Sequence, residues 1–291
     1  MTTAEAASAP GLVRMMPSRI WLCIGLAALV LPTMVRVAQE HWTSDDGAHG
    51  PILLATALWL LWRARATIEA HRRPVHSWGW TLLLLPLLLL HAFASAYDVL
   101  FVQTATLYAT LIVLAVLYWG TAVLRRLWFP VLYFAFLIVP PGTVVAEATL
   151  PLKLWISNAA VDLLHLFGYP VAQSGAAIHI DQYELLVERA CAGLGSLLSL
   201  TALGLLYVHL RRDAGVVRAL ILAALIIPVA ILANFIRVVM LVLMTYHVGN
   251  DFAQGVAHDA AGLVMFFIAM LCMLALDRIL EAFTPRRNAA S

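Results

Sequence analysis

The sequence has 291 residues, of which 63% are apolar and 12% are charged, and its mean hydropathy is +0.91. This composition excludes a soluble globular domain and indicates an integral membrane protein. The formal net charge of +2 is small. The arginines lie between apolar runs rather than in a patch interleaved with aromatic residues, which argues against nucleic acid binding.

Long apolar runs divide the whole chain. Lipid offers no partner for unpaired backbone groups, so each run is expected to cross the membrane as a helix, which takes about 20 residues. The first run lacks a small-residue cleavage site and is interpreted as an anchor rather than a removable signal. We predict an all-α polytopic membrane protein, one membrane domain over residues 1–291, with about eight transmembrane helices. The runs lie at about 18–38, 49–62, 78–97, 99–119, 127–145, 191–210, 216–237 and 258–276.

Basic residues gather on one side of these runs. Cytoplasmic connections are enriched in Lys and Arg, so both termini, residues 1–17 and 282–291, are expected to be cytoplasmic tails. Fourteen of the 18 basic residues lie on this side: Arg14, Arg19, Arg63, Arg65, Arg72, Arg73, Arg125, Arg126, Arg211, Arg212, Arg218, Arg278, Arg286 and Arg287. The external side has Arg36, Lys153, Arg189 and Arg237.

The external side carries a long segment that does not span, residues 146–190. Its first part, "ATLPLKLWISNAAVDLLHLFG", has apolar residues at helical spacing, which predicts an amphipathic helix on the outer leaflet. Its second part, "AAIHIDQYELLV", alternates around Asp181 and Gln182, which predicts a short β-hairpin before the sixth helix. The apolar positions of the helix are Leu150, Leu154, Ile156, Val161, Leu164 and Phe167, and its polar positions are Lys153, Asn158 and Asp162.

Counting from the cytoplasmic charges gives the depth of three chemically notable residues. Cys191 precedes Arg211, Arg237 follows Arg218, and His258 precedes Asp277. The separation is nearly the same in all three cases, about 20 residues, which at about 1.5 Å per helical residue is roughly one bilayer core. We therefore expect the three residues at the same outer rim, on three different helices.

Each of the three has a chemical and a structural interpretation. Cys191 would lie near a helix N-terminus, where a thiolate is favoured, or it packs a helix end as a small apolar residue. Arg237, with Asn234, stands alone in the apolar stretch "ILANFIRVVMLVLM" and is either functional or extended toward headgroups. His258, followed by Asp259, is either a base or an interfacial histidine. Cysteine, histidine and arginine together suit acyl transfer.

A second external cluster, "EHWTSDDGAHGP", contains His41, Asp45, Asp46 and His49. Imidazole and carboxylate groups are common metal ligands. The spacing matches no strong metal signature, however, and a solvated acidic loop is the better interpretation. We predict neither a metal nor another cofactor.

Several segments resemble the exosortase and archaeosortase family of membrane cysteine transpeptidases. "DDGAHGPILLATALWLLWRAR" is similar to the family's early histidine-glycine segment, and "WFPVLYFAFLIVPP" to its Phe-Pro to Pro-Pro segment. "GYPVAQSGAAIHI" follows as expected. "ERACAGLGSL", "ANFIRVV" and "AHDAAGLVMFF" match, in order, the segments that carry the family's cysteine, arginine and histidine.

The resemblance implies that Cys191 attacks a substrate peptide bond, His258 handles the proton and Arg237 stabilises the oxyanion. The substrates would be exported proteins with a C-terminal tail of the PEP-CTERM kind: a motif often containing Pro-Glu-Pro, a membrane helix and a basic cluster. The acyl-thioester would pass to an unknown acceptor or to water. The site would face the periplasm at a bacterial inner membrane. Supporting positions are Asn234, Asp259, Glu188 and His49.

Other interpretations of the same residues stay open. In a transporter or channel for an anionic solute, Arg237, His258 and Asn234 would line the path. In a non-catalytic scaffold, Cys191 would be replaceable. Arg189 and Ala192 also depart from the acid and serine common around the family's cysteine, which leaves the substrate subclass open.

Overall fold

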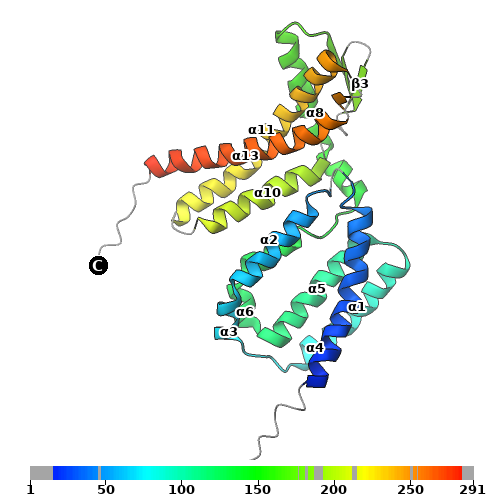
Figure 1. Cartoon of the computed structure of the whole chain (residues 1–291), viewed down its shortest axis with the longest axis vertical. Helices are drawn as coiled ribbons and strands as arrows, with labels where there is room; N and C mark the ends of the chain where they lie inside the picture. The colour runs from blue at the N-terminus through cyan, green and yellow to red at the C-terminus, as the bar shows by residue number, and fades with distance from the viewer. Residues whose placement is uncertain are drawn as a thin grey trace, which may run out of the picture.

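A computed structural model describes residues 16–44, 47–175, 177–180, 183–186, 193–211, 215–249, 252–253 and 255–283. These residues form a mostly helical protein with one small sheet (Figure 1). An N-terminal group of helices lies in the lower part of that view. The C-terminal helices lie side by side above it, inclined to the N-terminal group.

The N-terminal group is built around the adjacent helices α4 and α5, and α1 packs along α5. Each helix follows an apolar stretch, as lipid exposure requires. The helices of this group are α1 (Met16–Glu40), α2 (Gly50–Arg63), α3 (Arg65–His71), α4 (Trp78–Ala96), α5 (Leu100–Trp119), α6 (Thr121–Arg126) and α7 (Trp128–Ala135).

The apolar run at 127–145 does not form one straight helix. Helix α7 ends at Ala135 and α8 (Gly142–Leu166) begins after Pro140 and Pro141, with a bend of 98° between the two helical stretches. A residue that precedes proline disfavours the α conformation, so two consecutive prolines stop the helix. The run predicted as a span over 127–145 is therefore bent, and it counts as one span only if the two stretches are taken together.

The number of candidate spans also differs from the prediction. Five helices in the described part of the chain are long and apolar enough to cross a membrane, or up to six if the bent pair is one span. They are Ile20–Glu40, Trp78–Ala96, Leu100–Trp119, Val216–Val248 and Ala260–Phe283. The predicted number was about eight. Gly50–Arg63 and Leu197–Leu210 are apolar but shorter.

Helix α8 has a different buried face from the predicted one. Ile156, Val161 and Leu164 are buried, as apolar positions should be, but Leu150 and Phe167 are exposed. Lys153, which we expected on the polar side, is only 8% exposed. The reason is that α8 packs against α11 and the sheet, so its protein neighbours select the stripe that is buried.

A small antiparallel sheet follows α8. Its strands are β1 (Val171–Ser174), β2 (Ala177–Ile180) and β3 (Tyr183–Leu186), in the order β1-β2-β3. The predicted hairpin region corresponds to β2 and β3, in which Ile178 pairs with Leu185. The third strand, β1, was not predicted. Ile178 and Ile180 are fully buried and join α8 and α11 in one apolar core.

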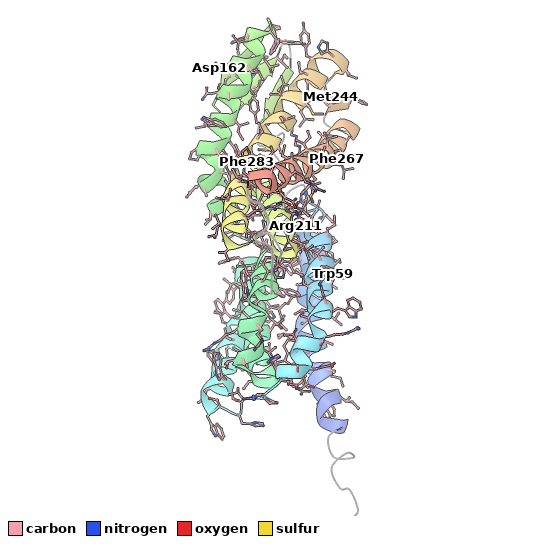
Figure 2. The ribbon with its side chains drawn as sticks, turned by 90° about the vertical axis from the view of Figure 1, so that its left-hand side faces the viewer. Trp59, Asp162, Arg211, Met244, Phe267 and Phe283 are labelled. Atoms are coloured by element: carbon pink, nitrogen blue, oxygen red, sulfur yellow. The ribbon has the colours of Figure 1, made fainter. Side chains whose placement is uncertain are left out.

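The C-terminal group consists of α10 (Gly193–Leu210), α11 (Val216–Val248) and α13 (Val256–Phe283). Helix α11 remains continuous through Pro228, and its 33 residues span about 50 Å. Its first half packs with α10 and α13. Its second half extends past them to α8 and the sheet. Figure 2 shows Met244 of α11 and Asp162 of α8 at the same end of the molecule.

Helix α10 joins the two groups. Ala202 and Leu206 of α10 are buried against Ala57 of α2 and against Phe129 and Tyr133 of α7. The N-terminal helices are therefore fixed to the helix whose first described residue follows Cys191 by two positions.

Candidate functional site

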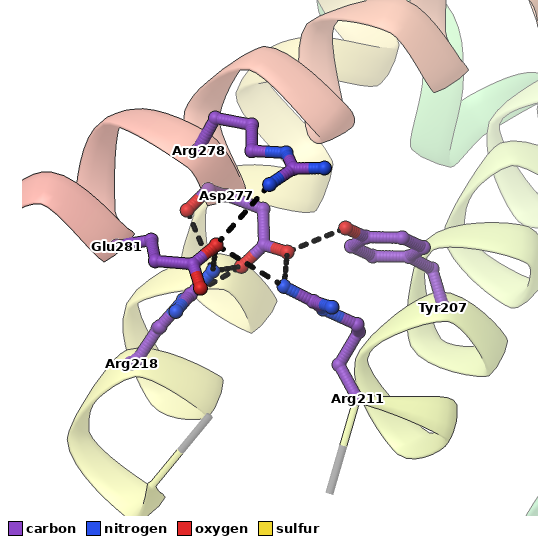
Figure 3. Close-up of polar contacts among 6 residues, drawn as sticks. All are labelled: Tyr207, Arg211, Arg218, Asp277, Arg278 and Glu281. Atoms are coloured by element: carbon purple, nitrogen blue, oxygen red, sulfur yellow. Dashed lines mark hydrogen bonds and ion pairs between the residues drawn. The ribbon is translucent and has the colours of Figure 1, made fainter. Parts of the chain in front are cut away.

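An ionic cluster fixes one end of α10, α11 and α13 to one another (Figure 3). Asp277 of α13 lies at its centre and is 1% exposed. Its Oδ2 accepts a hydrogen bond from Tyr207 Oη at 2.6 Å and lies 2.8 Å from Arg211 Nη2. Its Oδ1 accepts from Arg218 Nε at 2.6 Å. Glu281 adds a second carboxylate, 3.4 Å from Arg218 Nη2.

The cluster gives the three helices a common reference level. Arg211, Arg218 and Asp277 are the residues from which the depths of Cys191, Arg237 and His258 were counted. Because these reference residues meet, the rises along α11 to Arg237 and along α13 to His258 start from one level. Equal rises of about 30 Å along neighbouring helices end near one level.

Arg237 lies between the two apolar cores of α11. Its side chain is 4% exposed, with Ala233 in the core on one side and Val238 in the core on the other. A Cβ added to Gly262 of α13 would lie 4.0 Å from Arg237 Nη2. The guanidinium therefore reaches the surface of α13 where that helix carries no side chain.

The other two predicted catalytic residues are placed only in part. Cys191 and Glu188 lie outside the described residues. His258 and Asp259 belong to the first turn of α13, and their side chains are outside the description. His258 precedes Gly262 by four residues, so both positions are on one face of the helix. That face is the one that Arg237 contacts.

His49 comes from the N-terminal group but packs on α13, the helix that Arg237 reaches. It occupies the position before α2, and its ring centroid is 4.6 Å from that of Phe266 in α13. Burial, together with the Arg237 charge, holds the pKa of His49 below its ordinary value. Its Nδ1 is buried and has no hydrogen-bond partner in the part of the chain that the structure describes.

Asn234 is the second buried polar group beside Arg237. It is 3% exposed and precedes Arg237 by three residues, so both lie on the same side of α11. Among the described residues, no donor reaches its Oδ1. Buried polar atoms are nearly always hydrogen-bonded, so the two orphan atoms call for a partner.

A cavity of about 320 Å³ is lined in part by His49. It lies between the loop that ends at His49, the bend from α7 to α8, and α10. Lys153 and Ser199 contribute to its wall. Neither was assigned to the site from the sequence, because Lys153 is typical of a surface residue and Ser199 is one of many small residues in an apolar run. The two consecutive prolines, Pro140 and Pro141, were the feature of the sequence that could have indicated the bend, and with it the cavity.

The loop that carries His49 is tightly packed. A Cβ at Gly47 would overlap the carbonyl of His41, and one at Gly50 would overlap the indole of Trp42. The glycines thus let the chain close on itself ahead of α2. In the described residues no three His, Cys, Asp or Glu side chains gather to hold a metal ion. Asp45 and Asp46 of the cluster considered for metal binding lie outside them.

The candidate spans define a multi-pass membrane protein. Residues 41–275 match the family described as transmembrane exosortase, which covers most of the chain. The protein therefore belongs to the exosortase family, as its sequence motifs predict. Exosortases are generally cysteine transpeptidases. Comparison with curated proteins and with solved structures gave no match.

Proposed function

We propose that the protein is a membrane-embedded cysteine peptidase and transpeptidase that cleaves C-terminal sorting tails of exported proteins. The contact between Arg237 and α13 at Gly262 carries this proposal, because it brings a buried cation to the helix face shared by His258. Tight packing of α10, α11 and α13 around the ionic cluster supports the convergence of Cys191 with the other two.

In the first half of the reaction, the Cys191 thiolate attacks the scissile carbonyl carbon. Negative charge develops on the carbonyl oxygen, and the Arg237 guanidinium stabilises it with hydrogen bonds and charge. His258, protonated by the thiol, donates that proton to the leaving amine as the C–N bond breaks. The product is an acyl-thioester on Cys191 and a released tail.

In the second half, an acceptor nucleophile or water attacks the thioester carbonyl. His258 removes the proton of the nucleophile, Arg237 again holds the oxyanion, and the Cys191 thiolate leaves. Asn234 and His49 would orient these groups from the membrane side. Asp259 and Glu188 are the carboxylates closest in sequence to His258 and Cys191, and we propose that they support them.

We propose that this chemistry takes place at the periplasmic face of a bacterial inner membrane, with both termini, residues 1–17 and 282–291, in the cytoplasm. The distribution of Lys and Arg supports this orientation. The substrate tail, anchored in the same bilayer, would present its scissile bond at the outer rim.

The decisive experiment replaces Cys191. A periplasmic reporter protein fused to a tail with a Pro-Glu-Pro motif, a membrane helix and a basic cluster is co-expressed with the enzyme. Wild-type enzyme should shorten the reporter, whereas Cys191→Ala should leave it intact at an equal level of membrane-inserted enzyme. Cys272→Ala is the matched control, because Cys272 packs in the α11–α13 core. Cleavage by the Cys191→Ala enzyme would disprove the nucleophile assignment.

A further inference from the structure

The cavity at the α7–α8 bend has the size and composition of a binding site rather than a packing defect. Its volume of about 320 Å³ lies at the lower end of the range for ligand pockets. Packing defects in protein interiors are rarely larger than a water molecule. The cavity is also lined by both polar and apolar groups, including two histidines and two serines as well as Leu53 and Val145.

Three separate parts of the chain meet at the cavity. The loop before α2 provides His41 and His49, the bend provides residues 136–140, and α10 provides Leu198 and Ser199. Ser199 follows Cys191 by eight residues in the sequence. The cavity therefore lies alongside the helix that follows the candidate nucleophile.

His49 connects the cavity to helix α13. It lines the cavity, its ring contacts Phe266 of α13, and the charge of Arg237 acts on it. A group bound in the cavity would therefore meet the imidazole of His49. The orphan Nδ1 of that imidazole is an acceptor or a donor, according to its tautomer, for such a group.

We propose that this cavity is the subsite that holds the extended peptide segment next to the scissile bond, and that His49 hydrogen-bonds the main chain of that segment. The inference rests on the proposed peptidase function. An extended peptide offers alternating N–H and C=O groups together with side chains, which the mixed lining of the cavity accommodates. A lipid chain would call for an apolar lining throughout.

Gly142 offers a way to fill the cavity without disturbing the fold. It lies at the first position of α8, lines the cavity, and a Cβ added to it meets no atom within 4 Å. Gly142→Trp should lower kcat/KM for the reporter at least about tenfold, a change equivalent to one lost favourable contact. Gly142→Ala should have little effect. Gly25→Trp, on α1 away from the cavity and also without a neighbour within 4 Å, is the matched control.

Photo-crosslinking tests occupancy of the cavity directly. A benzophenone amino acid replaces Phe136, which lines the cavity, or Phe134, which does not, in the uncleaving Cys191→Ala enzyme. The peptide segment of the reporter should crosslink to position 136 and not to position 134. His49→Asn, which keeps a polar atom near the place of Nδ1, should retain at least about ten times the kcat/KM of His49→Ala.

The outcomes separate the subsite from the function. If wild-type enzyme cleaves the reporter through Cys191 but Gly142→Trp cleaves it equally well and position 136 does not crosslink, the subsite proposal is wrong and the function stands. If wild-type enzyme does not cleave the reporter, the proposed function itself fails. Crosslinking at position 136 together with loss of cleavage in Gly142→Trp supports both.

Discussion

At the scale of single residues, the burial of Arg237 between two apolar cores supports the functional role that we propose for it. A guanidinium 4% exposed between two apolar cores is costly unless something in the site uses it. Its contact with the side-chain-free surface at Gly262 leaves it directed at α13. We therefore expect its shape, and not only its charge, to matter.

Replacing Arg237 tests that expectation. Arg237→Ala should lower kcat for the reporter by about 10²–10³, as loss of one oxyanion-hole donor does in other enzymes. Arg237→Lys keeps the charge but loses the planar fork, so it should remain well below wild type. Cleavage rates in reconstituted membranes provide the measurement. Full activity of Arg237→Lys would show that a point charge is sufficient.

His49 gives the stability of the protein a pH dependence. Because its pKa in the folded protein is lowered from the ordinary value of 6.5, the unfolded chain binds this proton more readily than the folded protein does. Stability from the neutral ring is therefore complete above pH 6.5 and decreases as the pH falls below it. Desolvation is the largest cause, followed by the charge of Arg237.

The measurement is the Tm of the detergent-purified protein at pH 7.5 and at pH 5.5. Wild type should lose more thermal stability on acidification than His49→Asn, which cannot titrate in this range. An identical loss in both proteins would contradict the lowered pKa of His49. His76→Asn is the comparison, since His76 lies in the connection between α3 and α4, away from the site.

At the scale of the elements, the ionic cluster aligns the three helices that carry the candidate site. Asp277 is ion-paired with two arginines, one after the end of α10 and one near the start of α11. Without that carboxylate, Glu281 would be the remaining acidic partner of the buried Arg218 among the described residues. Removal of one partner from a buried ion pair costs about 3–5 kcal/mol.

Asp277→Asn should accordingly lower the Tm strongly and also reduce cleavage, although Asp277 is far along α13 from His258. Arg278→Ala is the control. Arg278 belongs to the same turn, but its side chain is 81% exposed, and within the described part of the chain its ion pair is with Glu281, at 3.7 Å. Exposed pairs contribute about 0–1 kcal/mol. Equal losses of Tm and of cleavage in the two variants would contradict the inference that the cluster aligns the helices.

At the scale of the whole molecule, helix α11 connects the ionic cluster at one end to α8 and the sheet at the other. Its continuous 33 residues exceed the length of about 20 that a bilayer core requires. Its second half packs with α8 and the sheet, at the end opposite the ionic cluster. We propose that α8 and the sheet lie outside the membrane. The candidate site lies where the two parts of α11 meet.

Cysteine labelling tests this layout. In a protein without Cys23, Cys191 and Cys272, Ser174→Cys on the exposed end of β1 should react with a membrane-impermeant thiol reagent in intact spheroplasts. Arg278→Cys, at the end of α13 with the ionic cluster, should react only after permeabilisation. The reverse pattern would invert the topology, and labelling of both from outside would refute a separation by the membrane.

Local patterns in the sequence were sufficient to predict the membrane class, most helix positions and the exosortase family. The reason is that hydropathy and short motifs depend only on residues that are close in the chain. These patterns also predicted a common depth for Cys191, Arg237 and His258, since helical rise is fixed. The break at Pro140 and Pro141 was visible in the sequence, yet hydropathy alone merged it into one span.

Only the tertiary structure showed that His49 of the N-terminal group packs on Phe266 of α13, and that Lys153 and Ser199 line one cavity. These residues are far apart in the chain, and no periodicity links them. Their meeting depends on how α2, α7 and α8 pack on α10 and α11, which is decided by shape complementarity among many side chains at once. The sequence determines most of the elements, because hydropathy is local, and the packing between distant elements determines which side chains share a site.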